Sequence, residues 1–170
     1  GSVPALTGIV SNNFQLHDKW IYCCDDPDVK SVGSDSKEGM MSPRNLLATG
    51  LGDMLKIATN FNGKVIGVAL KDRAAIMPAG HGADAAYWWD TSAGHFITST
   101  YYMNELPRWV KEENKKIGTK PKTDVKTSVM GVTKTFQMAE AALENEKLGQ
   151  DSITDLLAIS VSSTDAIGHV

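Results

Sequence analysis

Two continuous apolar runs constrain the fold of this chain more than any other feature. They are Val65–Leu70 and Leu156–Val161, and neither alternates with polar residues. Such runs are typical of central strands of a parallel sheet, where helices cover both faces. Helical patterns separate the two runs, so the sequence predicts an α/β fold. We expect an α/β/α sandwich with a largely parallel sheet.

The spacing of apolar residues also predicts three helices. Ser42 and Pro43 supply an N-cap and a first-turn proline for a helix over residues 43–59, whose expected buried face holds Leu47, Leu51, Met54 and Ala58. A second helix is predicted over Leu106–Lys116 and a third over residues 132–148, with Val132, Phe136, Ala139 and Leu143 buried and Gly149 ending it. Further strands are expected at Trp20–Cys24, Tyr87–Trp89 and Phe96–Tyr102.

Length and charge limit the classes of function. With 170 residues the chain suits a single domain over residues 1–170, in which the polar stretch 115–126 is expected to be an exposed connector. The net charge is -3, which argues against a nucleic-acid partner. No apolar run is long enough to span a membrane, and the first residues lack the pattern of a signal peptide. The adjacent pair Cys23 and Cys24 forms neither a disulfide framework nor a zinc motif.

Polar residues directly follow both apolar runs, where ligands collect in open α/β sheets. Lys71 and Arg73 flank Asp72 after the first run. Two cations at a strand end suit an anion such as phosphate, which arginine binds as a planar fork and lysine as a point charge. The alternative is a solvated loop in which Asp72 neutralises one of them.

After the second run, Asp165 and His169 stand four residues apart. A carboxylate and an imidazole at this spacing can reach one divalent ion. The alternative is that Asp165 caps a helix and His169 is an ordinary surface residue. The other three histidines, His17, His81 and His95, lack a second ligand nearby in sequence, which favours a structural role. The aromatic residues between 87 and 102 lack the interleaved basic residues expected of a nucleic-acid stacking platform, which favours core packing or a subunit contact.

At these segments the sequence resembles a known family. Ser162–His169 looks like the zinc-binding signature of the type I phosphodiesterase/nucleotide pyrophosphatase family, within the alkaline phosphatase superfamily. Gly1–Asn12 resembles the stretch just after the nucleophile of that family. Leu70–Arg73, Met77–His81 and Ala85–Trp88 are similar to the bacterial phosphate-irrepressible alkaline phosphatases.

The resemblance implies an alkaline phosphatase-like fold, two zinc ions and a phosphorylated threonine intermediate. Asp165 and His169 would bind one zinc, and Asn12, Lys71 and Arg73 would contact the phosphoryl oxygens. The threonine nucleophile is expected before Gly1, and further zinc ligands lie upstream of Gly1 and beyond Val170. The chain is therefore expected to be a central fragment that holds one partial zinc site and is inactive alone.

The expected function is that of a bacterial zinc-dependent phosphatase, periplasmic or secreted, that hydrolyses small-molecule phosphate monoesters. A lysine and arginine pair favours a monoester, whose terminal phosphate carries one more negative charge than a diester. Two alternatives remain at this point. One is a phosphodiesterase or nucleotide pyrophosphatase of the same family, and the other is a non-catalytic module that binds an anion or a protein.

Overall fold

A computed structural model of the chain describes residues 13–16, 18–163 and 168. In chain order its elements are β1 (Asn13–Leu16), β2 (Lys19–Tyr22), β3 (Ser31–Val32), the 3-10 turn η1 (Lys37–Gly39), α2 (Leu51–Ala58), β4 (Val65–Ala69), α3 (Asp72–Ala79), β5 (Ala85–Asp90), β6 (His95–Ser99), α4 (Arg108–Ile117), α5 (Val129–Asn145) and β7 (Leu156–Ser160). Among these residues, no helix is long and apolar enough to cross a membrane.

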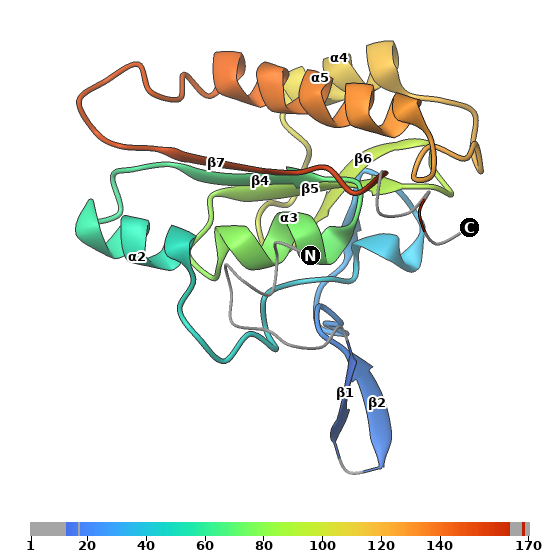
Figure 1. Cartoon of the computed structure of the whole chain (residues 1–170), viewed down its shortest axis with the longest axis horizontal. Coiled ribbons are helices and arrows are strands. Elements are labelled where there is room, and N and C mark those ends of the chain that lie inside the picture. The colour runs from blue at the N-terminus through green and yellow to red at the C-terminus, as the bar shows by residue number, and fades with distance from the viewer. Residues whose placement is uncertain (1–12, 17, 164–167, 169–170) are drawn as a thin grey trace.

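The elements form three layers around a five-stranded sheet with the order β3-β6-β5-β4-β7. Helices α4 and α5 cover one face, and α2 and α3 cover the other (Figure 1). The predicted α/β/α sandwich is confirmed. The sheet is mixed, because β5 and β7 pair in parallel with β4, whereas β6 and β3 add as antiparallel strands. The expectation of a largely parallel sheet therefore holds only for the half that contains the two apolar runs.

The core lies on both faces of β4 and β5. Every residue of β4 is buried, and so are Tyr87, Trp88 and Trp89 of β5. Tyr87 packs edge-on against Trp109 of α4, with the ring centroids 5.6 Å apart. The prediction of core packing for the aromatic residues between 87 and 102 is confirmed for the three of β5 and for Phe96, whereas Tyr101 is exposed.

The predicted helix over residues 43–59 is wrong in its first half. The hydroxyl of Ser42 does not cap a helix: it donates to Asp26 and accepts the N–H of Arg44 in a local turn. Gly50 has an extended backbone and α2 begins only after it. Leu47, Leu51 and Met54 are exposed, and the buried side of α2 is formed by Gly52, Asp53 and Lys56.

The other predicted helices are shifted by only a few residues. Helix α4 ends at Ile117, so the first three residues of the stretch 115–126 are helical. Helix α5 begins at Val129, and Gly149 follows it with a positive φ of 69°. Two of the residues expected on its buried face, Phe136 and Leu143, are exposed. The face that packs on the sheet is rotated toward smaller side chains, among them Met138, Ala139 and Ala142.

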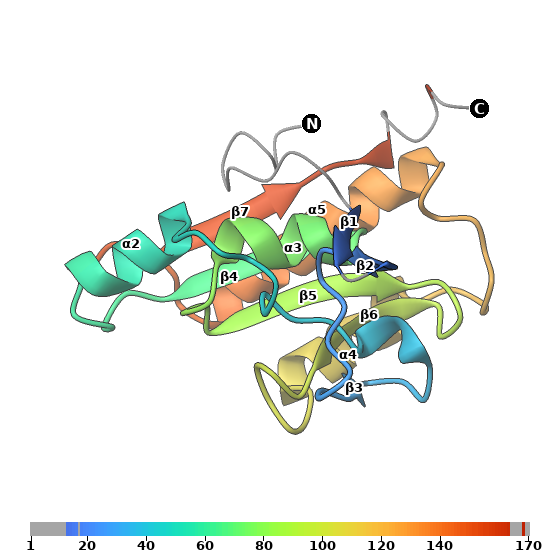
Figure 2. The same ribbon diagram turned by 90° about the horizontal axis from the view of Figure 1, so that it is seen from below.

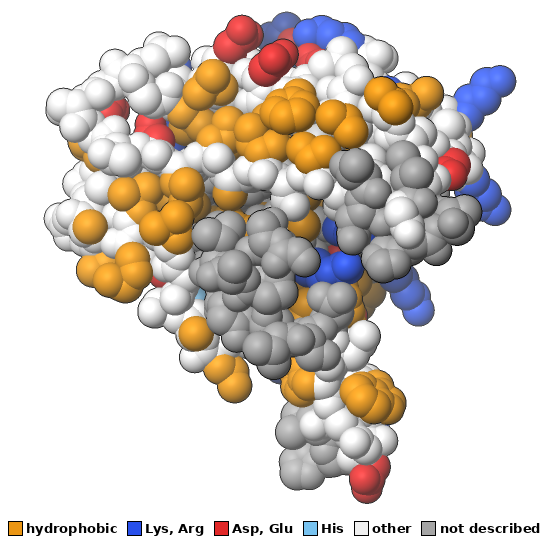
Figure 3. All heavy atoms as spheres, in the orientation of Figure 1, with side chains coloured by type: hydrophobic (Ala, Val, Ile, Leu, Met, Phe, Trp, Pro, Cys, Tyr) orange, Lys and Arg blue, Asp and Glu red, His pale blue; other side chains and the backbone are white. Residues whose placement is uncertain are grey.

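The edge of the sheet at β7 is apolar and exposed in the described part of the chain. In Figure 3 apolar side chains gather along this side of the molecule, over α2 and over α5. The large exposed side chains on these three elements are Leu51, Met54, Ile57, Val129, Met130, Phe136, Leu143 and Ile159. Contiguous exposed apolar side chains of this kind often mark a surface that contacts another part of a protein or a partner.

Candidate functional site

The carboxyl end of β4 places Lys71 and Arg73 together at the start of α3. Strand β4 ends at Ala69, Lys71 is the residue just before α3, and Arg73 is its second residue. The N-terminus of a helix carries partial positive charge and free N–H groups, which favour an anion. The segment enters a helix and does not form a solvated loop, and all three of its charged residues are partly buried. As the alternative expected, however, Asp72 lies beside one of the cations, since it shares the hydrogen-bonded neighbour Tyr22 with Arg73.

Tyr22 orients Arg73 and was missed by the sequence analysis. Nη1 of Arg73 donates to the Tyr22 hydroxyl at 3.1 Å, and that hydroxyl donates to Oδ1 of Asp72 at 2.8 Å. Burial and the nearby charge of Asp72 raise the pKa of Tyr22 well above its usual range. The hydroxyl therefore keeps its proton at any working pH and links the carboxylate to the guanidinium.

The residues after Tyr22 fix its position. Cys23 and Cys24 are free thiols buried against the sheet and α3, in a cluster that includes Ala74 and Ala75. Because two consecutive side chains are anchored there, the end of β2 is held against the start of α3. In the sequence, the apolar stretch Trp20–Cys24 indicated that this segment is buried. It did not indicate that Tyr22 contacts Asp72 and Arg73.

The second polar segment starts at the same edge of the sheet. Ala69 at the end of β4 pairs with Ser160 at the end of β7, so Lys71 and the residues after Ser160 leave the sheet side by side. A Cβ at Gly131 of α5 would lie 2.6 Å from Ser163 Oγ and 2.6 Å from Leu70 Cδ1. The chain leading toward Asp165 is thus packed closely against the residue before Lys71.

Three predicted site residues lie outside the described residues. Asp165 and His169 follow Ser163, and Asn12 immediately precedes β1, whose first residue Asn13 pairs with Tyr22. Their roles stay predictions. Among the residues that the structure does describe, no group of three or more side chains could hold a metal ion.

Two of the remaining histidines have structural contacts, as expected. The ring of His81 lies between Asp53, at 3.3 Å, and the carbonyl oxygen of Leu46, at 2.9 Å. His95 contacts the carbonyl oxygen of Gly33 at 2.8 Å. His17 lies outside the described residues.

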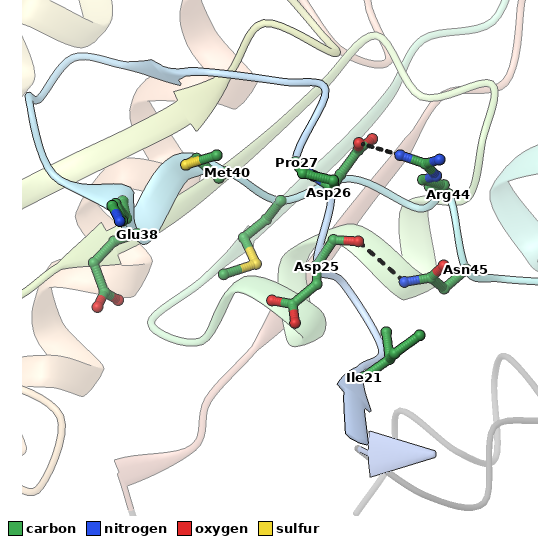
Figure 4. Close-up of a pocket in the computed structure, with 10 residues that line it drawn as sticks. Ile21, Asp25, Asp26, Pro27, Glu38, Met40, Arg44 and Asn45 are labelled. Carbon is green, nitrogen blue, oxygen red and sulfur yellow. Dashed lines mark hydrogen bonds and ion pairs between the residues drawn. The ribbon is translucent and has the colours of Figure 1, made fainter. Parts of the chain in front are cut away.

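A separate cavity of about 810 Å³ lies beside the hairpin base and is poorly suited to phosphate. Figure 4 shows Arg44 turned toward Asp26, and its Nη1 lies 3.0 Å from Asp26 and 2.6 Å from Asp28. The carboxylates of Asp25 and Glu38 also line this cavity. Because its arginine is already paired and acidic groups surround it, the cavity does not compete with Lys71 and Arg73 as an anion site.

These observations define a class of protein: an α/β sandwich with a lysine and an arginine at the carboxyl edge of its sheet, at the start of a helix. Comparison with known proteins shows which members of this class the chain is similar to. The chain is 40% identical to alkaline phosphatase PhoV of Synechococcus elongatus and 38% identical to alkaline phosphatase PafA of Elizabethkingia meningoseptica, with 99% of the chain covered in each case. It is 41% identical to a protein of Myroides odoratus named calcium-transporting ATPase. No family model matches the chain.

The fold agrees with this similarity. The crystal structure of wild-type PafA matches 98% of the chain with a TM-score of 0.88 and 37% identity. The chain belongs to the alkaline phosphatase superfamily, as a homologue of these bacterial phosphatases. It spans 40% of the length of PhoV and PafA. The aligned stretch of 220 residues in PhoV is longer than the chain, so this relative carries additional residues within the matched region.

Replacing Tyr22 with phenylalanine tests the link to Arg73. In the full-length protein we expect kcat/KM for a phosphate monoester to fall about tenfold, because Arg73 loses a hydrogen bond that orients it, while the ring still fills its space. Steady-state kinetics would measure this change. Tyr101→Phe is a matched control, since the Tyr101 hydroxyl donates to the carbonyl oxygen of His81, at a histidine assigned a structural role. Equal losses in the two variants would contradict the role given to Tyr22.

Proposed function

We propose that this chain is part of a metal-dependent phosphatase that hydrolyses phosphate monoesters of small molecules. The observation that carries the proposal is the placement of Lys71 and Arg73 at the start of α3, beside the strand that leads to Asp165. Homology to alkaline phosphatases supports it. A crystallised PafA variant carries substitutions of a lysine and an arginine separated by one residue, the same spacing as Lys71 and Arg73.

In this proposal the described residues bind and orient the phosphoryl group. The Arg73 guanidinium, held by Tyr22, donates to one phosphoryl oxygen, and the Lys71 ammonium balances the charge of another. Fixed donors of this kind stabilise the charge that develops on the equatorial oxygens during transfer. Asn12 would add a third donor. The threonine that would accept the phosphoryl group is not among these 170 residues.

We assign Asp165 and His169 to one zinc ion of this phosphatase. Carboxylate and imidazole are donors that zinc accepts, and a catalytic zinc ordinarily takes three protein ligands. The third ligand and the second zinc site would therefore come from other parts of the protein. When bound, zinc ions would stabilise the attacking and leaving oxygens. We also propose a periplasmic or secreted location, as the family resemblance implies.

Metal removal tests this function. The full-length protein is expected to hydrolyse phenyl phosphate, to lose at least about 100-fold in kcat after exhaustive chelation, and to recover on addition of zinc. Release of inorganic phosphate is the measurement, and zinc content by elemental analysis is a second readout. The 170-residue chain alone is the control and should show no turnover. Full activity without metal would refute the proposal.

The non-catalytic alternative makes the opposite prediction. A module that only binds an anion would take up inorganic phosphate through Lys71 and Arg73, but the full-length protein would release no phosphate from any ester. Calorimetric titration of phosphate, run beside the hydrolysis assay, separates the two outcomes.

A further inference from the structure

Cys23 and Cys24 form a pair of adjacent buried thiols directly beside the proposed phosphate site. They occupy the two central positions of a β-turn, which is closed by a hydrogen bond of 3.0 Å from the N–H of Asp25 to the carbonyl oxygen of Tyr22. They are the only cysteines in the 170 residues. Neither the proposed phosphate binding nor the proposed zinc site uses these thiols.

The turn connects the thiols to the residue that orients Arg73. Tyr22 is the first residue of the turn, and its hydroxyl contacts both Asp72 and Arg73 at the start of α3. Figure 2 shows the hairpin that ends at Tyr22 beside the first turn of α3. A change in the backbone of the turn would therefore move the Tyr22 side chain relative to Arg73.

The two thiols interact with each other. Both side chains belong to one buried cluster with Ala74 and Ala75 of α3, and the thiol of Cys24 hydrogen-bonds to the sulfur of Cys23. This bond lowers the pKa of Cys23, and the nearby Arg73 cation acts in the same direction, whereas burial raises the pKa of Cys24. Cys23 is also the more exposed of the two, at 4% against 0%. Since the thiolate is the reactive form, Cys23 is the thiol that an oxidant would meet first.

We propose that Cys23 and Cys24 are an oxidative modification site, at which a reversible disulfide between the two residues weakens phosphate binding. This inference rests on the proposed function and adds a regulation of the same site. A peroxide is the oxidant. The Cys23 thiolate attacks a peroxide oxygen and releases hydroxide, which leaves a sulfenic acid on Cys23. The sulfur of Cys24 then attacks the Cys23 sulfur, and the hydroxyl leaves with the Cys24 proton as water. In sum, two thiols and one hydrogen peroxide give one disulfide and two water molecules.

The position of the pair explains why this bond would form and why it would affect Arg73. The reaction adds no atom to the pair, so the product fits side chains that are already buried. Adjacent Cα atoms are about 3.8 Å apart, below the usual range of about 4.4–6.8 Å in disulfides. The backbone of the turn must therefore adjust, which displaces Tyr22. Strained disulfides are readily reduced, and an oxidising periplasm or exterior would supply the conditions in which the bond forms.

The experiment follows activity and the redox state of the pair in the same full-length protein. After treatment with hydrogen peroxide and removal of the excess, kcat/KM for phenyl phosphate should fall about tenfold, as in Tyr22→Phe, because Arg73 loses the same hydrogen bond. A phosphine reductant, which binds zinc less than a dithiol does, should restore it. Trypsin cleaves after Lys19 and Lys30, so mass spectrometry would detect the disulfide as the loss of two hydrogens from the peptide over residues 20–30.

Three variants locate the effect. Cys23→Ala/Cys24→Ala cannot form the bond, so its kcat/KM should change by less than about twofold, although its methionines meet the same peroxide. Cys24→Ala alone should retain a sulfenic acid on Cys23, which dimedone traps. Tyr22→Phe should form the disulfide but lose less than about twofold in further activity, because the hydrogen bond that the disulfide breaks is already absent.

The outcomes separate this inference from the proposed function. A disulfide that leaves ester turnover unchanged would overturn the inference while the proposed function stands. The same holds for a peptide that stays reduced in the treated protein, or for an equal loss of activity in Cys23→Ala/Cys24→Ala. A tenfold further loss in Tyr22→Phe would overturn the link through Tyr22. If the protein hydrolyses no phosphate ester in either redox state, the proposed function itself fails, and its regulation fails with it.

Discussion

Replacing Lys71 with alanine in the full-length protein is expected to lower kcat/KM for phenyl phosphate by about 100- to 1,000-fold, the loss typical of removing one fixed donor from a developing negative charge. The loss for a phosphate diester should be about tenfold or less. The difference follows from charge, because a diester lacks the additional negative charge that a second cation beside Arg73 would balance. Lys71 directly precedes α3 and Arg73 is its second residue, so both cations belong to the same helix N-terminus, which itself favours negative charge.

Steady-state kinetics on both substrates would measure this difference. Lys120→Ala is the matched control, since it removes an exposed lysine from the stretch between α4 and α5 and should change neither value by more than about twofold. Equal losses of monoester and diester turnover would favour the phosphodiesterase alternative. Unchanged turnover of both substrates would show that Lys71 does not contact the phosphoryl group.

The part of the fold that could be predicted best from the sequence is the strand that is buried on both faces, because burial on both faces leaves an unbroken apolar run. The run Val65–Leu70 is apolar without alternation because helices cover β4 on both faces, and the prediction of a buried parallel strand is confirmed there. Leu156–Val161 also forms a parallel strand, but among the described residues β7 lies at the edge of the sheet and is only partly buried, so the prediction of a buried central strand is not met. Once both strands were placed, the position of Lys71 at the carboxyl edge followed. A strand was expected at Phe96–Tyr102, where β6 lies, but its antiparallel direction and the short strand β3 depend on hairpin and loop geometry that no such run reveals.

The errors in predicting the buried faces of α2 and α5 have the same physical cause. Helical periodicity shows which residues are apolar but not which of them the rest of the chain covers. Leu51 and Met54 on α2, and Phe136 and Leu143 on α5, fit a helical stripe and yet are exposed. The buried sides of both helices include residues that an apolar stripe does not mark, such as Gly52 and Lys56 in α2 and Gly131 and Thr135 in α5.

The candidate site was predictable only in part, because its residues come from distant segments. Lys71 and Arg73 were found from their place after a buried strand, and the resemblance supplied Asn12, Asp165 and His169, whose roles stay predictions. Tyr22 was missed, because its importance depends on where β2 meets α3. A tyrosine at this position forms no motif by itself.

Replacing Gly67 with alanine is expected to cost about 3 kcal/mol of unfolding free energy, at the upper end of the range for an overfilled core. Gly67 is the central residue of β4, and a Cβ there would lie 2.0 Å from the carbonyl oxygen of Ala75 in α3. Backbone cannot rotate away as a flexible side chain would, so α3 must move off the sheet. Urea unfolding should show a midpoint lowered by about 1.5 M, for a slope of about 2 kcal/mol per M.

Gly50→Ala is the matched control for this prediction. A Cβ at Gly50 would lie 3.6 Å from the nearest atom, the carbonyl oxygen of Met77, which is an ordinary contact. Its cost should stay below about 1 kcal/mol. Gly67→Ala should also weaken phosphate binding in the full-length protein, because α3 carries Lys71 and Arg73 at its first turn. If both variants unfolded at the same urea concentration, the close packing of β4 against α3 would not be what holds these cations in place.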